Sequence, residues 1–217
     1  MSTMAEDETV KKEDDHDLIG CEYEIEVIDK DGNVTERQKG KNSLLIQFIG
    51  SIISALDPNG YNTICPSTDV KNVAGGAASN MLYQYNSNTY CGIPSAGTFG
   101  VITNGIVVGS GNTPVTADDY KLATIITHGV GAGQLQAQAG AIQDVVLASP
   151  RASFRIDRTF INGSGAPVTV REIGIYSLWY DGGVGSQICT CRDVLLAPVA
   201  VANGSTLFVK YTIYISI

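Results

Sequence analysis

The chain has 217 residues, a formal net charge of −8 and a pI near 4.6. An acidic chain lacks the basic face that nucleic acid requires and is repelled by anionic membranes, so we expect neither as a partner. Hydrophobic residues make up 44% of the chain and charged residues 17%, while 24 Gly and 10 Tyr favour turn-rich β structure over long helices.

Residues 1–19 are predicted to form a charged N-terminal arm. Residues 1–17 carry seven acidic residues and two lysines, and therefore five of the eight net negative charges. This composition predicts disorder in isolation, and no apolar signal-peptide core is present, so we expect synthesis in a cytoplasm with reduced thiols. The arm is either a solvating tail or, as we favour, a clasp that docks on a neighbouring subunit through Asp14, Asp15 and Asp17.

Residues 20–56 are predicted to form a β-hairpin followed by a helix. Residues 21–29 alternate polar and apolar side chains, Asp31-Gly32 is a hairpin turn signal, and residues 33–39 would return. The cluster of Arg37, Lys39 and Lys41 is either a solvated strand edge or a contact for the acidic arm.

Apolar residues between Leu44 and Leu56 follow helical spacing after a possible cap at Asn42 or Ser43. The helix would be buried against the sheet or another subunit, and its apolar run is too short to span a bilayer.

Residues 57–104 are predicted to form an insert rich in Tyr, Asn and Gly, with short strands at 80–85 and 98–103. Long loops of this kind are usually functional. Tyr83, Tyr85 and Tyr90 among Asn and Ser residues give a composition typical of adaptable contact surfaces. A subunit interface is the favoured interpretation, and a tip that binds glycan is the alternative.

Residues 105–217 are predicted to form a β-sandwich core. The run at 106–108 indicates a buried strand, and Thr116 and the acids after it predict a helical turn at 118–123. The glycines here lack the spacing of a phosphate-binding loop. Short strands are expected at 121–129 and 132–140.

The C-terminal third has the clearest alternation in the chain. Strands from 154 and from 168 are expected to form a hairpin around a turn at 162–165, and the apolar register shifts between Val170 and Ile173, which predicts a β-bulge. A Gly-rich loop at 181–186 leads to residues 187–193 and 194–201. Asn203-Gly204 then sets a hairpin into a final strand, which requires a partner on its edges.

No residue pattern predicts catalysis, a cofactor or a metal. Cys189 and Cys191 would share one face of a strand, but zinc needs two further ligands, so buried structural thiols are expected. His128 lacks the nucleophile and orienting acid of a catalytic set. Asp157 and Glu172 could face each other as a glycosidase pair, although a cross-strand salt-bridge ladder is favoured; its cations would be Arg155, Arg158 and Arg171.

Several stretches together resemble a family of structural proteins in the particles of tailed phages. They are NSLLIQFI, GIVVGSGNTPVTADDYKLATII, GAGQLQ, FRIDRTFINGSGAPVTVREIGIY, CRDVL and NGSTLFVKYTI, within residues 20–56 and 105–217. The resemblance implies a virion subunit, made in the host cytoplasm, that assembles with itself and with capsid or tail neighbours. The alternative is a module of a tail fibre or spike that recognises a host-surface glycan.

Overall fold

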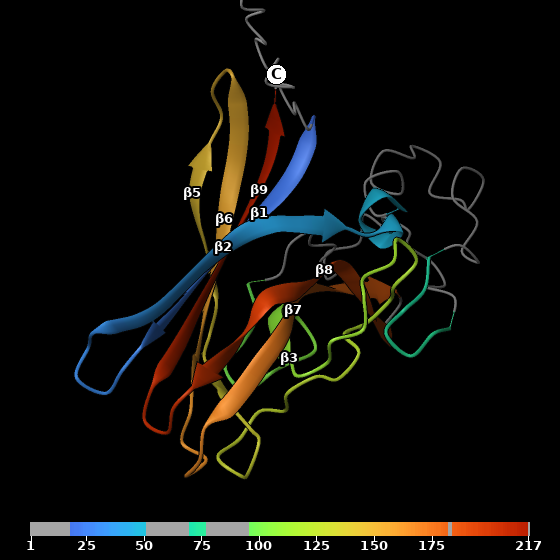
Figure 1. The fold of residues 1–217 in the computed structure, drawn as a ribbon. Coiled ribbons are helices and arrows are strands. Elements are labelled where there is room, and N and C mark those ends of the chain that lie inside the picture. Colours follow the sequence, from blue (N-terminus) through green and yellow to red (C-terminus); the bar gives the residue numbers. More distant parts are fainter. Residues whose placement is uncertain (1–17, 51–69, 77–95, 182–183, 217) are drawn as a thin grey trace, which may run out of the picture.

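The computed structural model describes residues 18–50, 70–76, 96–181 and 184–216. The fold is mainly β and antiparallel, as predicted, with two sheets packed as a sandwich (Figure 1). The strands are β1 (Ile19–Ile28), β2 (Val34–Leu44), β3 (Gly105–Gly109), β4 (Gln136–Ala137), β5 (Ala141–Val146), β6 (Arg151–Ile161), β7 (Val168–Asp181), β8 (Val184–Val201) and β9 (Thr206–Ser216).

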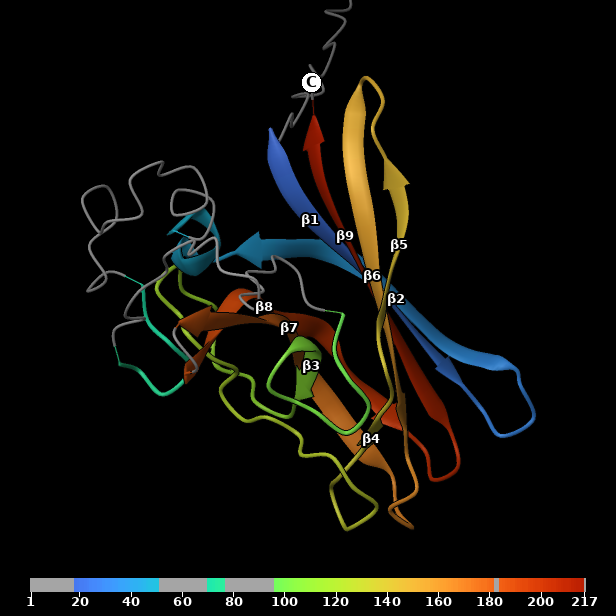
Figure 2. The ribbon, with the colours of Figure 1, turned by 180° about the vertical axis from the view of Figure 1, so that it is seen from behind.

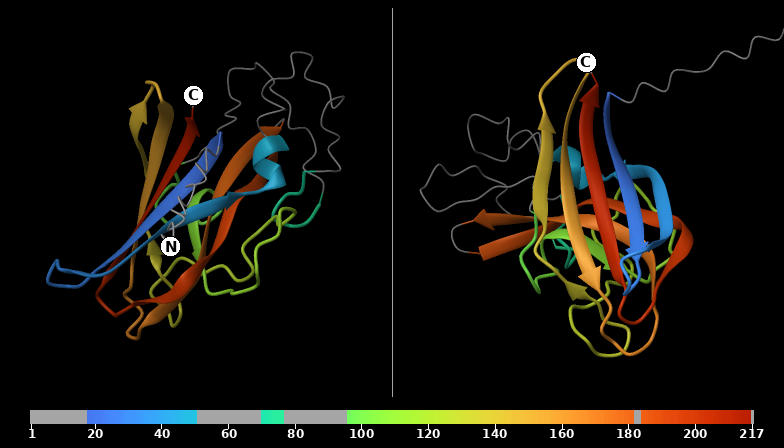
Figure 3. Two further views of the ribbon diagram at one scale, coloured as in Figure 1. Left: turned by 45° about the horizontal axis from the view of Figure 1, so that its top comes forward. Right: turned by 90° about the vertical axis from the view of Figure 1, so that its left-hand side faces the viewer.

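Sheet A contains β2, β1, β9 and β6 in that order, with β4 and β5 both paired to β6. Sheet B contains β8, β7 and β3. Strand β2 joins the sheets, because it pairs with β1 along its length and with β8 only at Ser43 and Leu44. Figures 2 and 3 show β2 crossing from the upright strands of sheet A toward sheet B.

The main core lies between the sheets. Every second residue of β1 faces inward, from Cys21 to Val27, against residues such as Ile173 and Ile175 of β7. A smaller core lies on the other face of sheet B, where loop residues cover it, so Val107 of β3 is as buried as its neighbours. Because both faces of β3 are buried, its sequence is a continuous apolar run.

Three sequence predictions about strands are confirmed. The Asp31-Gly32 hairpin joins β1 to β2, with Gly32 at a φ of 88°. The pairing of β7 with β8 shifts register between Val170 and Glu172, where the bulge was predicted. The last strand finds both partners within the chain, because β9 lies between β1 and β6.

Neither the turn at 162–165 nor the turn at Asn203-Gly204 is a hairpin turn, contrary to our expectation. Both are corners between the sheets, since β6 pairs with β9 in sheet A and β7 pairs with β8 in sheet B. The buried amide of Asn162 holds the first corner by donating to the carbonyls of Ala166 and Val201. Local sequence shows that the chain turns here but not which strand it meets next.

Other local predictions were wrong at their boundaries. Asn42, Ser43 and Leu44 belong to β2, and the helix begins at Ile46 and covers the described residues up to 50. The strand predicted at 98–103 and the helical turn predicted at 118–123 are not formed. In place of the strands predicted at 121–129 and 132–140, the structure has isolated bridges and the short strand β4. Residues 187–193 and 194–201 are one strand, β8.

Candidate interaction surfaces

The outer face of sheet A carries a network of paired charges. Glu24 of β1 lies 3.2 Å from the ammonium of Lys39 on β2 and 3.7 Å from that of Lys210 on β9. Arg37 lies 2.7 Å from the carboxylate of Glu26. Burial alone would raise the pKa of Glu24, but the Lys39 hydrogen bond and the charges of Lys210 and Arg37 lower it.

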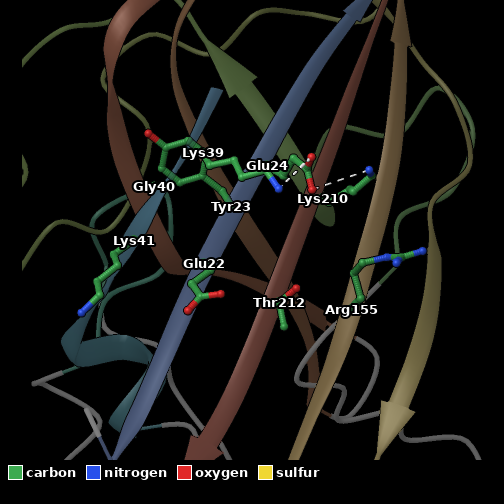
Figure 4. Close-up of a pocket in the computed structure, with 9 residues that line it drawn as sticks. All are labelled: Glu22, Tyr23, Glu24, Lys39, Gly40, Lys41, Arg155, Lys210 and Thr212. Carbon is green, nitrogen blue, oxygen red and sulfur yellow. Dashed lines mark ion pairs between the residues drawn. The ribbon is translucent and has the colours of Figure 1, made fainter. Parts of the chain in front are cut away.

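These pairs border a shallow cavity of about 450 Å³ on the same face (Figure 4). Its lining includes Lys39 and Lys41 of the predicted basic cluster, with Arg155 and Lys210 from the far side. Arg37 and Lys39 of the cluster pair with carboxylates of β1. The cluster lies on the edge of sheet A. Between Val34 and Lys41, β1 is the only strand that pairs with β2 among the described residues.

The other predicted interface residues lie outside the described residues. These are Asp14, Asp15 and Asp17 of the arm and Tyr83, Tyr85 and Tyr90 of the insert. Contact between the acidic arm and Arg37, Lys39 or Lys41 stays a prediction.

A second surface lies where sheet A extends past the end of sheet B. The inward-facing residues of β9 are buried as far as Ile213, but Ile215 is 48% exposed. In Figures 1 and 2 the ends of β1, β9, β6 and β5 project beyond β7 and β8. The inward alternation of sheet A thus continues beyond the sheet that covers it.

The residues around this projecting end form an apolar groove of about 340 Å³. We call it the apolar end of sheet A; it comprises Ile19, Val145, Leu147, Phe154, Ile213 and Ile215, with Phe48 of the helix at its border. Val145 is 63% exposed and Leu147 86% exposed. Sequence analysis missed this surface, because alternation alone does not show where an opposing sheet stops.

The neighbouring edge strand β5 is exposed at every residue. Its pairing with β6 breaks between Gln143 and Val146, where Asp144 has a φ of 50° and pairs with Arg155. A bulge of this kind interrupts the row of backbone groups that another strand would need. Contacts at this edge therefore depend on side chains more than on strand addition.

A buried network beneath the loops of sheet B explains residues that resembled a catalytic set. Glu172 is fully buried and accepts hydrogen bonds from the backbone N–H groups of Gly111, Ala123 and Thr124. The guanidinium of Arg192 donates to Glu172 and also to Asp119. The pair fixes the loop after β3 to the sheet.

Asp157 and Glu172 do not face each other, so the disfavoured glycosidase pair is excluded. The two residues lie on strands of different sheets, and Asp157 accepts hydrogen bonds from Arg155 at 2.7 and 2.9 Å. The predicted ladder is also wrong in its partners, because Arg158 contacts carbonyl oxygens and Glu172 pairs with Arg192.

The sequence predicted that Cys189 and Cys191 share one face of a strand, but in β8 they lie on opposite faces. The register shift beside Ile175 and Tyr176 puts one extra residue on β8. Cys191 consequently joins the core between the sheets, whereas Cys189 joins the smaller core on the other face. Both are buried free thiols.

His128 and the described acids and thiols form no metal cluster. The His128 Nδ1 accepts a hydrogen bond from the Ala137 N–H, and its ring packs edge-on against Phe99. No group of three or more potential ligands occurs in the described part of the chain. No helix there is long and apolar enough to cross a membrane.

Comparison with known proteins adds no relative. No family model, curated protein or solved structure matches the chain.

The sequence analysis missed the buried acid Asp193, as it missed Arg192 beside it. Asp193 lies between the sheets, beside the point where β2 meets β8. It belongs to the CRDVL stretch, where it looks like an ordinary solvated acid. No local signal distinguishes it, because its burial depends on β1, β2 and β9 closing over it.

Proposed function

We propose that this protein is a structural subunit of a phage particle, which assembles with itself and with capsid or tail neighbours. The observation that carries the proposal is the apolar end of sheet A. A non-enzymatic role is part of the proposal, and the phage setting comes from the sequence resemblance alone.

Free energy would be gained by burying this apolar surface against a partner. Burial of apolar surface is worth about 25 cal/mol per Å², and contiguous exposed apolar patches mark contact sites. Val145, Leu147 and Ile215 lie around one groove, so a single partner would cover all three. Isolated exposed apolar residues elsewhere, such as Leu196, need no such explanation.

The same surface offers both parts of a self-complementary contact. Leu147 projects from the hairpin of β5 and β6, and the groove beside it has room for an aliphatic side chain. A two-fold interface requires one patch to carry both the projection and its receptor. A second copy of the chain is therefore the partner that we test first.

The test compares two leucines of equal exposure. Leu147→Asp places a charge in the apolar end, and Leu196→Asp makes the same change on β8, where the leucine is also 86% exposed. We expect Leu147→Asp to shift the molar mass from oligomer to monomer in light scattering and Leu196→Asp to leave it unchanged, with equal melting temperatures. A wild-type chain that is monomeric at all concentrations, or equal behaviour of the two variants, would rule out self-association through this surface.

A further inference from the structure

Strand β2 is attached to sheet B through a short seam. Among the described residues, it pairs with β8 at Ser43 with Arg192 and at Leu44 with Cys191. The N–H of Leu45 then donates to the Thr190 carbonyl at 3.0 Å. Apart from the side-chain hydrogen bond that Gln38 donates to the Ala197 carbonyl, the described backbone pairing of β2 and its next residue with β8 is confined to these three positions. So short a seam is sensitive to its immediate surroundings.

The carboxyl group of Asp193 lies directly against this seam. Its residue is 8% exposed, and its Oδ1 accepts a hydrogen bond of 3.4 Å from the Ser43 N–H. Its other oxygen, Oδ2, is buried without a hydrogen-bond partner among the described residues, and so is the hydroxyl of Tyr211. Burial of a carboxylate with so few donors is unfavourable.

The groups around Asp193 do not compensate a negative charge. Cys21 and Tyr23 of β1 and Tyr211 of β9 belong to the same core, and the Asp193 charge raises the pKa of each of them in addition to burial. Among the described residues, Arg192 is the cation whose charge acts on Asp193, but its guanidinium donates to Asp119, Glu172 and the Thr113 carbonyl. The adjacent arginine is thus engaged elsewhere.

We infer that the Asp193 carboxyl and the seam form a proton-dependent latch, in which protonation holds β2 on sheet B and loss of the proton loosens that junction. The latch acts on the junction between the sheets and is independent of the proposed assembly surface.

The titration range follows from burial. Burial raises the pKa of Asp193 to about 7, against the opposing effects of the Ser43 hydrogen bonds and the Arg192 charge. A carboxyl whose pKa is higher in the folded than in the unfolded chain contributes stability at low pH. That contribution is lost as pH rises from about 4 to about 7. Burial raises the pKa values of Cys21 and Tyr211 well above their usual ranges, so those two groups stay neutral there.

The experiment measures opening of the seam by amide hydrogen exchange between pH 5.5 and 8.5, corrected for intrinsic exchange rates. In the wild type we expect the protection of the Leu45 amide to fall at least about tenfold over this range. Asp193→Asn, which cannot ionise, should retain the same protection at both pH values. Asp157→Asn is the matched control: it removes another buried carboxylate, one that pairs with Arg155, and should leave the pH dependence at Leu45 intact.

A carboxyl ¹³C NMR titration of the wild type provides a reading that needs no variant. A midpoint for Asp193 near neutral pH would support the latch, and a midpoint near 4 would overturn it. Equal pH dependence of Leu45 exchange in the wild type and in Asp193→Asn would also overturn it. Both readings report on Asp193 or Leu45 and neither measures molar mass, so the latch and the assembly surface can fail separately.

Discussion

Two buried arginines of this protein are stabilised in different ways. Arg192 pairs with carboxylates, whereas Arg158 has no carboxylate partner among the described residues and donates instead to five carbonyl oxygens. The acceptors belong to Thr98, Val101, Asn104, Ile106 and Gln138. Burial lowers the pKa of Arg158 to about 10, which still leaves it charged at neutral pH. The guanidinium thus fixes the loop at residues 98–104, which is not part of a strand, to the sheets by donating hydrogen bonds to its carbonyl oxygens.

Replacing Arg158 with Met tests this role. Met keeps much of the side-chain volume but leaves five carbonyl oxygens, one of them fully buried, without their donor, so we expect a loss of at least about 3 kcal/mol in the free energy of unfolding. Urea denaturation measures it. The control is Arg37→Met, in which the arginine side chain is 55% exposed and its ion pairs contribute less than about 1 kcal/mol. Equal losses in both variants would contradict the role assigned to Arg158.

At the scale of elements, glycine–tyrosine pairs help to set the register of β1. Gly20 lies directly opposite Tyr214 on β9, and Tyr23 lies opposite Gly40 on β2. In each pair the tyrosine ring occupies the space above the glycine, so a β-carbon on Gly20 would lie 2.3 Å from the Tyr214 ring. The guanidinium of Arg151 stacks 3.3 Å from the centre of the same ring. A one-residue slip of β1 would break both pairs.

Gly20→Ala is therefore expected to destabilise the fold by about 1–2 kcal/mol, because Tyr214 must leave its place under Arg151. Thermal denaturation measures the effect. Gly163→Ala serves as the control, since a β-carbon there would meet Val130 at an ordinary 3.4 Å. A neutral Gly20→Ala variant would mean that the tyrosine is not held in place.

At the scale of the whole molecule, the arm must be removed at the right residue. Strand β1 begins at Ile19, which pairs with Ile215, and the Leu18 carbonyl accepts a hydrogen bond from the Ser216 N–H. A truncation that ends at residue 17 therefore leaves sheet A whole, whereas one that ends at residue 19 removes the start of β1. Removal of residues 1–17 also changes the net charge from −8 to −3, since these residues account for five negative charges.

We expect the chain without residues 1–17 to melt within about 2 °C of the full chain, because no strand of the sandwich is lost. In the favoured interpretation of the arm as a clasp on a neighbouring subunit, the truncated chain should form a smaller oligomer in light scattering. An unchanged oligomer would refute the clasp and leave assembly to the apolar end of sheet A.

The sequence by itself determined the local features of this protein. Alternation identified β1, β6 and β9, the turn residues identified the hairpin at Gly32 and the position of the turn at Gly204, and the shift after Val170 identified the bulge. These features depend on interactions between residues close in the chain, so a local pattern is sufficient to reveal them.

Only the tertiary structure decided which strands pair and how far sheet B covers the inner face of sheet A. The corner at Asn162 sends β7 to the other sheet, the extra residue in β8 separates Cys189 from Cys191, and closure of three strands buries Asp193. The apolar end of sheet A exists because sheet B stops before Ile215. Each of these outcomes depends on contacts between residues far apart in the chain, and a single sequence carries no local signal for them.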